Sequence, residues 1–248
     1  MSGHSKWATI KHKKAAADTK RGKIFTKLIR EITVAARTGG GNPDNNPRLR
    51  VVVATAKENN MPSDNIERAI KKGTGELPGA AYEEVHYEGY GLGGIAIYVQ
   101  CLSDNKNRTA AEIRSIFSRH AGSMAGAGSV AWLFEKKGLF VIDKNAVPED
   151  QLMEIVLGAG GEDLTAEGSV YEVTAAPHDF ENVKRALTEK KVPLQSAELT
   201  MLPKNLVKVS PENAKQVLAL IEALEDHDDV QNVYTNIDIP EEIMKEVA

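Results

Sequence analysis

Residues 139–201 read LFVIDKNAVPEDQLMEIVLGAGGEDLTAEGSVYEVTAAPHDFENVKRALTEKKVPLQSAELTM, and the succession of patterns in this stretch decides the fold at the centre of the chain. Short runs rich in Val, Ile, Leu, Phe and Tyr are typical of strands, whereas apolar residues at three- and four-residue steps are typical of helices. The predicted elements are, in order, a strand at 139–143, a helix at 149–158, strands at 163–166 and 170–174, a helix at 180–189 and a strand at 194–201. This βαββαβ order predicts a ferredoxin-like unit.

The segments on either side of this unit each carry part of a second α/β pattern. The elements predicted there are strands at 84–90, 95–102 and around 130–134, a helix at 107–120 and, after the central unit, a helix at 211–224 and a strand at 230–237. Neither part closes a sheet alone. We therefore expect residues 77–135 and 204–248 to form one two-layer α/β domain, with a ferredoxin-like domain of residues 136–203 inserted in it.

Residues 1–76 are expected to form a basic arm followed by a three-helix domain. The first helix has its apolar residues at three- and four-residue steps from Ile24 onward, and the glycines of residues 39–41 end it. Asn46 followed by Pro47 predicts the start of a second helix, and Pro62 the start of a third. The chain is thus predicted to be an α+β multidomain protein, with an N-terminal helical domain followed by two α/β two-layer, ferredoxin-like domains, one inserted in the other.

Charge is distributed very unevenly along this chain. Residues 1–75 contain 16 Lys and Arg against 6 Asp and Glu, a net charge of +10, whereas residues 76–248 have a net charge of −14. A basic cluster at one end is typical of nucleic-acid binding, because each phosphate that it neutralises releases condensed counterions. A solvated terminus that only aids solubility is the alternative.

The candidate nucleic-acid contacts lie in the arm and on the first helix. They are Lys6, Trp7, Lys11, His12, Lys13, Lys14, Lys20, Arg21, Lys23, Lys27 and Arg30. Lys predominates over Arg early in the arm, which favours phosphate contact over reading of base edges. Trp7 either stacks on an exposed base or anchors the arm on the helical domain.

Two further segments could contact phosphate, and each also has a purely structural interpretation. Lys106 and Arg108 flank a predicted helix start, where they form a possible secondary contact, although Asn105 is better explained as a helix cap. The glycine-rich segment 122–128 lacks the ending of a phosphate-binding P-loop and runs from helix into strand, so it is interpreted as a hinge or turn.

The sequence contains no recognisable catalytic constellation and no histidine pair at metal-ligand spacing. Glu84 and His86 are the nearest approach to an acid–base set, and solvation of a strand edge explains them equally well. The acidic residues between 222 and 229 are expected to be a solvated helix end, since they lack EF-hand spacing. We expect no enzymatic activity, no cofactor, no metal and no small-molecule substrate.

The single cysteine, Cys101, lies in an apolar run and is expected to be buried in a strand. One thiol cannot form an internal disulfide, which fits a reducing cytoplasm. No stretch approaches the roughly 20 apolar residues of a membrane helix, and no apolar segment follows the basic N-terminus as it would in a secretory signal. We therefore expect a cytoplasmic protein with no membrane partner.

Four segments resemble the YebC/PmpR family. They are GHSKWATIKHKKAAADTKRGKIFTKLIREI at 3–32, NMPSDNIERAIKKG at 60–73, YEGYGLGGIAIYVQCLSDNKNRTAAEIR at 87–114 and GSVAWLF at 128–134. The resemblance implies a helical N-terminal domain followed by two α/β domains, one inserted in the other. It also implies a cytoplasmic, probable transcriptional regulator that binds DNA.

The same resemblance leaves a second function open. Mitochondrial relatives are translational activators, and bacterial members are linked to ribosomes stalled on proline-rich nascent peptides. The leading hypothesis is a non-enzymatic transcriptional regulator whose basic N-terminal domain binds DNA. The alternative is a ribosome-associated translation factor that uses the same surface on ribosomal RNA and relieves such stalling.

Overall fold

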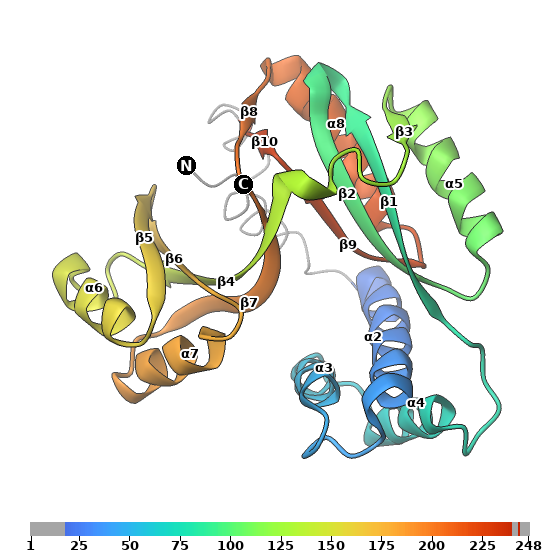
Figure 1. The fold of residues 1–248 in the computed structure, drawn as a ribbon, viewed down its shortest axis with the longest axis horizontal. Helices are drawn as coiled ribbons and strands as arrows, with labels where there is room; N and C mark the ends of the chain where they lie inside the picture. Colours follow the sequence, from blue (N-terminus) through green and yellow to red (C-terminus); the bar gives the residue numbers. More distant parts are fainter. Residues whose placement is uncertain (1–17, 240–242, 244–248) are drawn as a thin grey trace. The chain divides into compact units, whose positions relative to one another are not determined.

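The computed structural model describes residues 18–239 and residue 243 (Figure 1). These residues divide into two compact units. We call residues 18–129 and 215–233 the helix–sheet unit, and residues 130–214, 234–239 and 243 the ferredoxin-like unit. The two units are described separately below.

Three helices form the first part of the helix–sheet unit. They are α2 (Asp18–Gly39), α3 (Pro47–Glu58) and α4 (Ser63–Thr74). Asn46 caps α3 as its sequence predicts, because its side-chain oxygen accepts the Leu49 backbone N–H at 3.1 Å. The apolar stripes of the helices meet in one core, and α2 and α4 pack closely at Gly73, where an added Cβ would lie 2.8 Å from Ala36 Cβ.

A four-stranded sheet forms the rest of this unit, with the order β3-β1-β2-β9. Its elements are β1 (Glu83–Gly91), β2 (Ile95–Ser103), α5 (Lys106–Arg119), β3 (Ser123–Ala125), α8 (Pro211–Glu225) and β9 (Val230–Thr235). A Cβ atom added at Gly89 would lie close to Phe117 of α5, and one added at Gly91 would lie close to Val217 of α8. Since Gly89 and Gly91 lie on the same side of β1, α5 and α8 cover the same face of the sheet (Figure 1).

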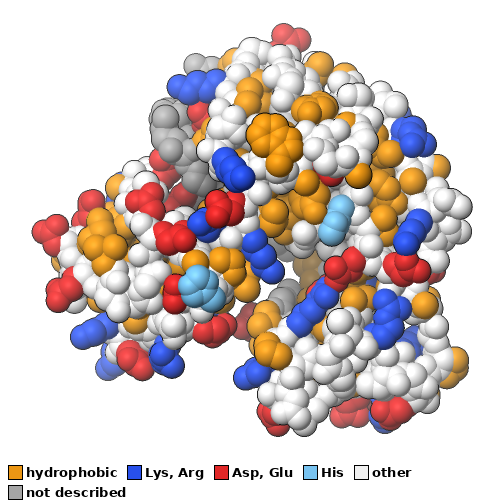
Figure 2. Space-filling model, viewed as in Figure 1, with side chains coloured by type: hydrophobic (Ala, Val, Ile, Leu, Met, Phe, Trp, Pro, Cys, Tyr) orange, Lys and Arg blue, Asp and Glu red, His pale blue; other side chains and the backbone are white. Residues whose placement is uncertain are grey.

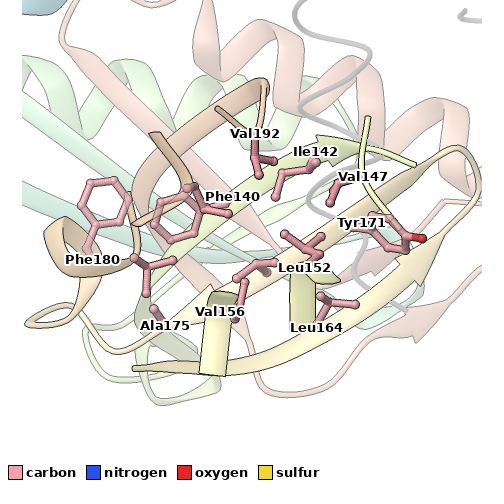
Figure 3. Close-up of a cluster of buried hydrophobic side chains, with 13 residues drawn as sticks. Phe140, Ile142, Val147, Leu152, Val156, Leu164, Tyr171, Ala175, Phe180 and Val192 are labelled. Carbon is pink, nitrogen blue, oxygen red and sulfur yellow. The ribbon is translucent and has the colours of Figure 1, made fainter. Parts of the chain in front are cut away.

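The ferredoxin-like unit has the βαββαβ order that the sequence predicts. Its elements are β4 (Phe134–Asp143), α6 (Glu149–Gly158), β5 (Gly161–Glu167), β6 (Val170–Ala175), α7 (Phe180–Glu189) and β7 (Leu194–Pro203). The sheet order is β5-β6-β4-β7, and every paired strand is antiparallel to its neighbour. One face of this sheet packs against both helices, with Phe140, Leu152 and Phe180 among the core side chains (Figure 3).

The sheet of the helix–sheet unit has the same arrangement with its strands permuted in the chain. In the order of the two sheets, β9 takes the place of β7, β2 that of β4, β1 that of β6 and β3 that of β5. The crossover β2–α5–β3 matches β4–α6–β5, and α8 precedes β9 as α7 precedes β7. The strand that comes third in the ferredoxin-like unit therefore comes first here. The predicted class, an α+β multidomain protein with a helical domain and two two-layer ferredoxin-like parts, is confirmed.

The predicted strand around 130–134 is wrong. Residues Ala131–Leu133 form a 3-10 turn, and β4 then runs without a break from Phe134 to Asp143. Glu135, Lys136 and Lys137 resemble a loop in sequence, but they pair with the end of β7, where Lys136 lies opposite Met201. A strand can accommodate charges where one of its faces meets solvent, so the charged run does not interrupt the ladder.

Two smaller departures concern the glycine-rich segment and the C-terminal strand. Residues 123–125 form the short strand β3, in which Met124 lies opposite Gly89. The strand predicted at 230–237 ends at Thr235, and β10 (Ile237–Asp238) pairs in parallel with β8 (Val207–Lys208). The division into three domains at 1–76, 77–135 with 204–248, and 136–203 remains a prediction, since the contacts define two compact units.

Candidate nucleic-acid interface

Only part of the predicted nucleic-acid site lies within the described residues. Lys6, Trp7, Lys11, His12, Lys13 and Lys14 lie outside them. Lys20 and Arg21 belong to the beginning of α2. Lys23, Lys27 and Arg30 follow on the same helix, and their side chains are described. Their spacing of four and three residues places these three side chains on one face of α2.

All three side chains contact one turn, which the sequence does not associate with α2. This turn joins α8 to β9 and reads EDHDD, and we call Glu225–Asp229 the acidic turn. Lys23 Nζ lies 3.1 Å from the Asp226 carboxylate. Lys27 Nζ donates a 2.7 Å hydrogen bond to the backbone carbonyl of Glu225. Lys23, Lys27 and Arg30 therefore form a basic stripe on α2, and this stripe is occupied by a segment some 200 residues away in the chain.

Arg30 makes the most extensive of these contacts. Its Nη1 donates to the Asp228 backbone carbonyl at 2.7 Å and also to the Asp229 carboxylate. A third acceptor, the carbonyl of Leu102 at the end of β2, lies 3.3 Å from the same nitrogen. The guanidinium also lies 5.2 Å from the centroid of the Tyr82 ring, close enough for a cation–π interaction. Arg30 thus joins α2 to the sheet of its own unit.

Asp229 is the centre of this network, although the sequence predicts a solvated helix end here. Its carboxylate is buried and accepts hydrogen bonds from Thr109 Oγ1 at 2.5 Å, from Arg108 Nη2 at 2.7 Å and from Arg30. Burial by itself would raise the pKa of Asp229, but the hydrogen bonds from Thr109, Arg108 and Arg30 outweigh it and lower this pKa to about 2. The carboxylate is therefore ionised at neutral pH. The expectation of a solvated acid is wrong for Asp229, whereas Glu222, Asp226 and Asp228 are exposed as expected.

The backbone of the acidic turn is fixed as well. The Leu102 N–H donates to the Asp229 carbonyl at 2.8 Å, which ties the turn to β2. His227 Nδ1 accepts the Asp229 backbone N–H at 3.1 Å. Since this nitrogen accepts, the ring proton of neutral His227 belongs on Nε2, which lies 2.8 Å from the Glu112 carboxylate.

Glu112, His227 and Asp229 also offer donor atoms within 4.8 Å of one another, as metal ligands would. The carboxylate of Asp229 is already occupied by two arginines and a hydroxyl, however. The two nitrogens of His227 are occupied by the Asp229 N–H and by Glu112. The cluster is therefore explained as a hydrogen-bonded network that holds the turn in place.

The predicted secondary contact, Lys106 with Arg108, is paired with carboxylates. Lys106 pairs with Glu83, and Arg108 pairs with Asp104 at 2.9 Å as well as with Asp229. Asn105 accepts the Arg108 backbone N–H at 3.1 Å, which confirms the predicted helix cap. Both predicted cations of this segment thus take part in ion pairs within the helix–sheet unit.

Several other cations on the helical part of the unit are exposed. Lys57 on α3 and Arg68, Lys71 and Lys72 on α4 form no ion pair with another described residue. Figure 2 shows blue Lys and Arg side chains interspersed with red Asp and Glu on the visible face of this part. No motif singles out these cations in the sequence, because Glu58, Asp64 and Glu67 are interspersed among them.

The remaining candidates from the sequence are accounted for by local contacts. Glu84 forms a 2.6 Å ion pair with Arg48, and the His86 ring lies 5.4 Å from the ring of Tyr98. In the glycine-rich segment, the Gly128 N–H donates to the Glu88 carboxylate at 2.7 Å. Cys101 is buried, as predicted, and burial followed by the charge of Asp229 raises the pKa of its thiol to about 12.

Across residues 18–239, no helix combines the length and the apolar character needed to cross a membrane.

Comparison with known proteins identifies the family. Residues 5–76 match the family described as the TACO1/YebC protein N-terminal domain, and residues 82–237 match the TACO1/YebC second and third domain. A probable transcriptional regulatory protein of Natranaerobius thermophilus is 56% identical over 248 residues, which cover 99% of both chains. A probable transcriptional regulatory protein of Geobacter sulfurreducens is 56% identical over 247 residues and all of both chains.

A solved structure agrees with this assignment. The crystal structure of a conserved hypothetical protein from Aquifex aeolicus superposes with a TM-score of 0.84 at 47% sequence identity, and it covers 96% of this chain and 98% of that one. The matches extend over the helical segment and both α/β parts. The chain belongs to the TACO1/YebC family.

Proposed function

We propose that this protein is a cytoplasmic transcriptional regulator that binds DNA through its basic N-terminal domain and catalyses no reaction. The observation that carries the proposal is the charge polarity, a net charge of +10 over residues 1–75 against −14 over residues 76–248. Such a distribution attracts a polyanion to one end of the chain and keeps the remainder away from it.

Three further observations support the proposal. The relatives from Natranaerobius thermophilus and Geobacter sulfurreducens are both named probable transcriptional regulatory proteins. The acid–base pair that the sequence offered, Glu84 and His86, is engaged with Arg48 and Tyr98. The single thiol, Cys101, cannot form an internal disulfide, which suits a protein of a reducing compartment.

The proposed contact surface is the arm with the beginning of α2. Its proposed members are Lys6, Trp7, Lys11, His12, Lys13, Lys14, Lys20, Arg21 and Lys23. Lys27 and Arg30, the two other candidates on α2, are held by the Glu225 carbonyl and the Asp229 carboxylate and keep α2 in position. Lysine-rich segments contact phosphates as point charges, so the proposal places affinity rather than base recognition in this surface. Lys106 and Arg108 would add phosphate contacts only by giving up the carboxylates with which they pair.

The first test measures binding to a fluorescein-labelled duplex DNA by anisotropy at several salt concentrations. Substituting Lys11, Lys13 and Lys14 by Ala should weaken binding and reduce the slope of log K against log salt by up to about 0.9 for each phosphate that is no longer neutralised. The matched control removes three exposed cations from α7 and its C-terminal end by Lys184→Ala, Arg185→Ala and Lys190→Ala, and it should leave the slope unchanged. Equal effects of the two triple variants would refute the assignment of this surface.

The second test identifies the nucleic acid that the protein contacts in the cell. Crosslinking of the tagged protein, followed by sequencing of the attached DNA and RNA, should give discrete peaks of promoter-region DNA. Enrichment of one ribosomal RNA site without DNA peaks would instead make the protein a translation factor, with the same basic surface as its RNA anchor. That outcome would overturn the transcriptional proposal.

A further inference from the structure

The basic stripe of α2 and the acidic turn face each other along their length. Lys23, Lys27 and Arg30 contact Asp226, the Glu225 carbonyl, and the Asp228 carbonyl with the Asp229 carboxylate, respectively. The turn carries four Asp or Glu among its five residues. Carboxylate oxygens on an ammonium or guanidinium group use the same donors that a phosphate would use. Through two carboxylates and two backbone carbonyls, the turn therefore occupies donors of Lys23, Lys27 and Arg30 that a phosphate could otherwise use.

The contacts differ greatly in exposure from one end of the stripe to the other. The side chains of Arg30 and Asp229 are 13% and 3% exposed, and Thr109 and Arg108 hold the same carboxylate. The side chains of Lys23 and Asp226 are 42% and 64% exposed. An exposed ion pair contributes little to stability and is screened by salt, whereas a buried pair is costly to break. The Arg30 end is therefore a fixed anchor, and the Lys23 end can exchange partners.

From this gradient we infer that the acidic turn competes with nucleic acid for the exposed end of the α2 stripe, as an autoinhibitory contact within the helix–sheet unit. This inference rests on the proposed function, and it adds a control over the same surface. In the wild type Asp226 keeps Lys23 away from the nucleic acid, and without this carboxylate Lys23 is free to bind a phosphate. Arg30 would stay on Asp229 and keep α2 in position.

Lys27 belongs with the anchor rather than with the exchangeable end. Its ammonium group bonds the backbone carbonyl of Glu225, so a change of the Glu225 side chain would not remove this partner. Asp226 and Asp228 are both exposed and belong to the turn, and their carboxylates repel an approaching phosphate. These two side chains are consequently the ones through which the turn opposes binding.

The test neutralises the exposed carboxylates of the turn and measures binding of labelled duplex DNA and of a labelled RNA hairpin. Asp226→Asn with Asp228→Asn should tighten binding and release Lys23 for one additional phosphate. Raising the salt from 50 to 200 mM should weaken the binding of the variant to duplex DNA by a factor about 3.5 times larger than for the wild type, because the variant makes one more phosphate contact. Both residues are exposed, so the variant is expected to fold, and far-UV circular dichroism checks this.

Two comparison variants separate the contact from the change in net charge. Glu154→Gln with Glu189→Gln removes two exposed carboxylates from α6 and α7, and its salt dependence should remain that of the wild type. Adding Lys23→Ala to the double variant of the turn should abolish the steeper salt dependence, because the released cation is then missing.

The outcomes distinguish this inference from the proposed function. If the wild type binds and the turn variant matches the α6–α7 control in affinity and salt dependence, the competition is refuted and the proposed function stands. Persistence of the steeper salt dependence after Lys23→Ala also refutes it. If the wild type and all variants bind neither the DNA nor the RNA, the proposed function falls and the competition falls with it.

Discussion

Replacing Asp229 by Asn tests the network that joins α2, α5 and β9. The substitution keeps the size of the side chain but removes the charge that Arg30 and Arg108 share. A hydrogen bond to a charged group contributes about 1.5 kcal/mol or more to stability. Losing the charge on two such bonds should lower the free energy of unfolding by about 3 kcal/mol at pH 7. Arg30 suffers most, because its side chain is only 13% exposed and water cannot replace the lost carboxylate.

The pH dependence of this loss follows from the lowered pKa of Asp229. A carboxyl group whose pKa is lower in the folded protein stabilises the fold above its ordinary pKa, and this stabilisation disappears as pH falls through the folded value. The pKa of Asp229 falls from 3.8 to about 2. That decrease corresponds to about 2 kcal/mol. The difference between wild type and variant should therefore shrink from about 3 kcal/mol at pH 7 to about 1 kcal/mol near pH 2.

Urea unfolding followed by far-UV circular dichroism at pH 7, 4 and 2.5 measures this difference. Hydrogen exchange at pH 7 locates it, since amides in α2 and β2 should exchange about 100-fold faster if they open with the helix–sheet unit. The matched control is Asp226→Asn, an exposed partner of Lys23, which should cost less than about 0.5 kcal/mol. A cost for Asp229→Asn no larger than that of the control, or a cost that does not change with pH, would refute the reasoning.

The remaining predictions concern packing in the same unit. Gly73→Ala should destabilise the helical part by about 2 kcal/mol, because the new methyl group would crowd Ala36 and the Thr33 carbonyl where α4 crosses α2, and thermal unfolding would show the loss. A variant as stable as the wild type would show that the two helices can separate without cost. Cys101 should resist alkylation by iodoacetamide at pH 8 in the native protein and react in urea, because burial raises the pKa of its thiol to about 12. Fast native labelling, followed by mass spectrometry, would contradict the buried position.

Much of the fold can be predicted because its signals are local. The caps at Asn46 and Asn105 follow from residue types at helix starts, and both form as expected. The βαββαβ order follows from apolar periodicity, which depends on neighbours within one or two turns of chain. The start of β4 is not predictable in this way, because the charged residues 135–137 have the composition of a loop and form a strand only by pairing with β7.

From the sequence, the candidate site can be predicted only as a region rich in Lys and Arg, without the contacts that these residues make. The excess of Lys and Arg over residues 1–75 is visible in the sequence, and so is the common face of Lys23, Lys27 and Arg30. The sequence does not show that the acidic turn contacts this face of α2. The acidic turn is separated from this face by about 200 residues, and the composition of the turn does not indicate whether its carboxylates are solvated or buried.

The helices, most of the strands, their order and the unequal distribution of charge can be predicted from the sequence, because backbone preference, capping and hydrophobic period act between near neighbours. By contrast, two features can be seen only in the folded protein: β1 takes the sheet position that the third strand, β6, has in the ferredoxin-like unit, and the acidic turn lies against α2. Those outcomes depend on which apolar faces pack together over long separations in the chain. The burial of Asp229 follows from that packing. A carboxylate is stable away from water only where it is paired and hydrogen-bonded, and Arg30, Arg108 and Thr109 provide these partners.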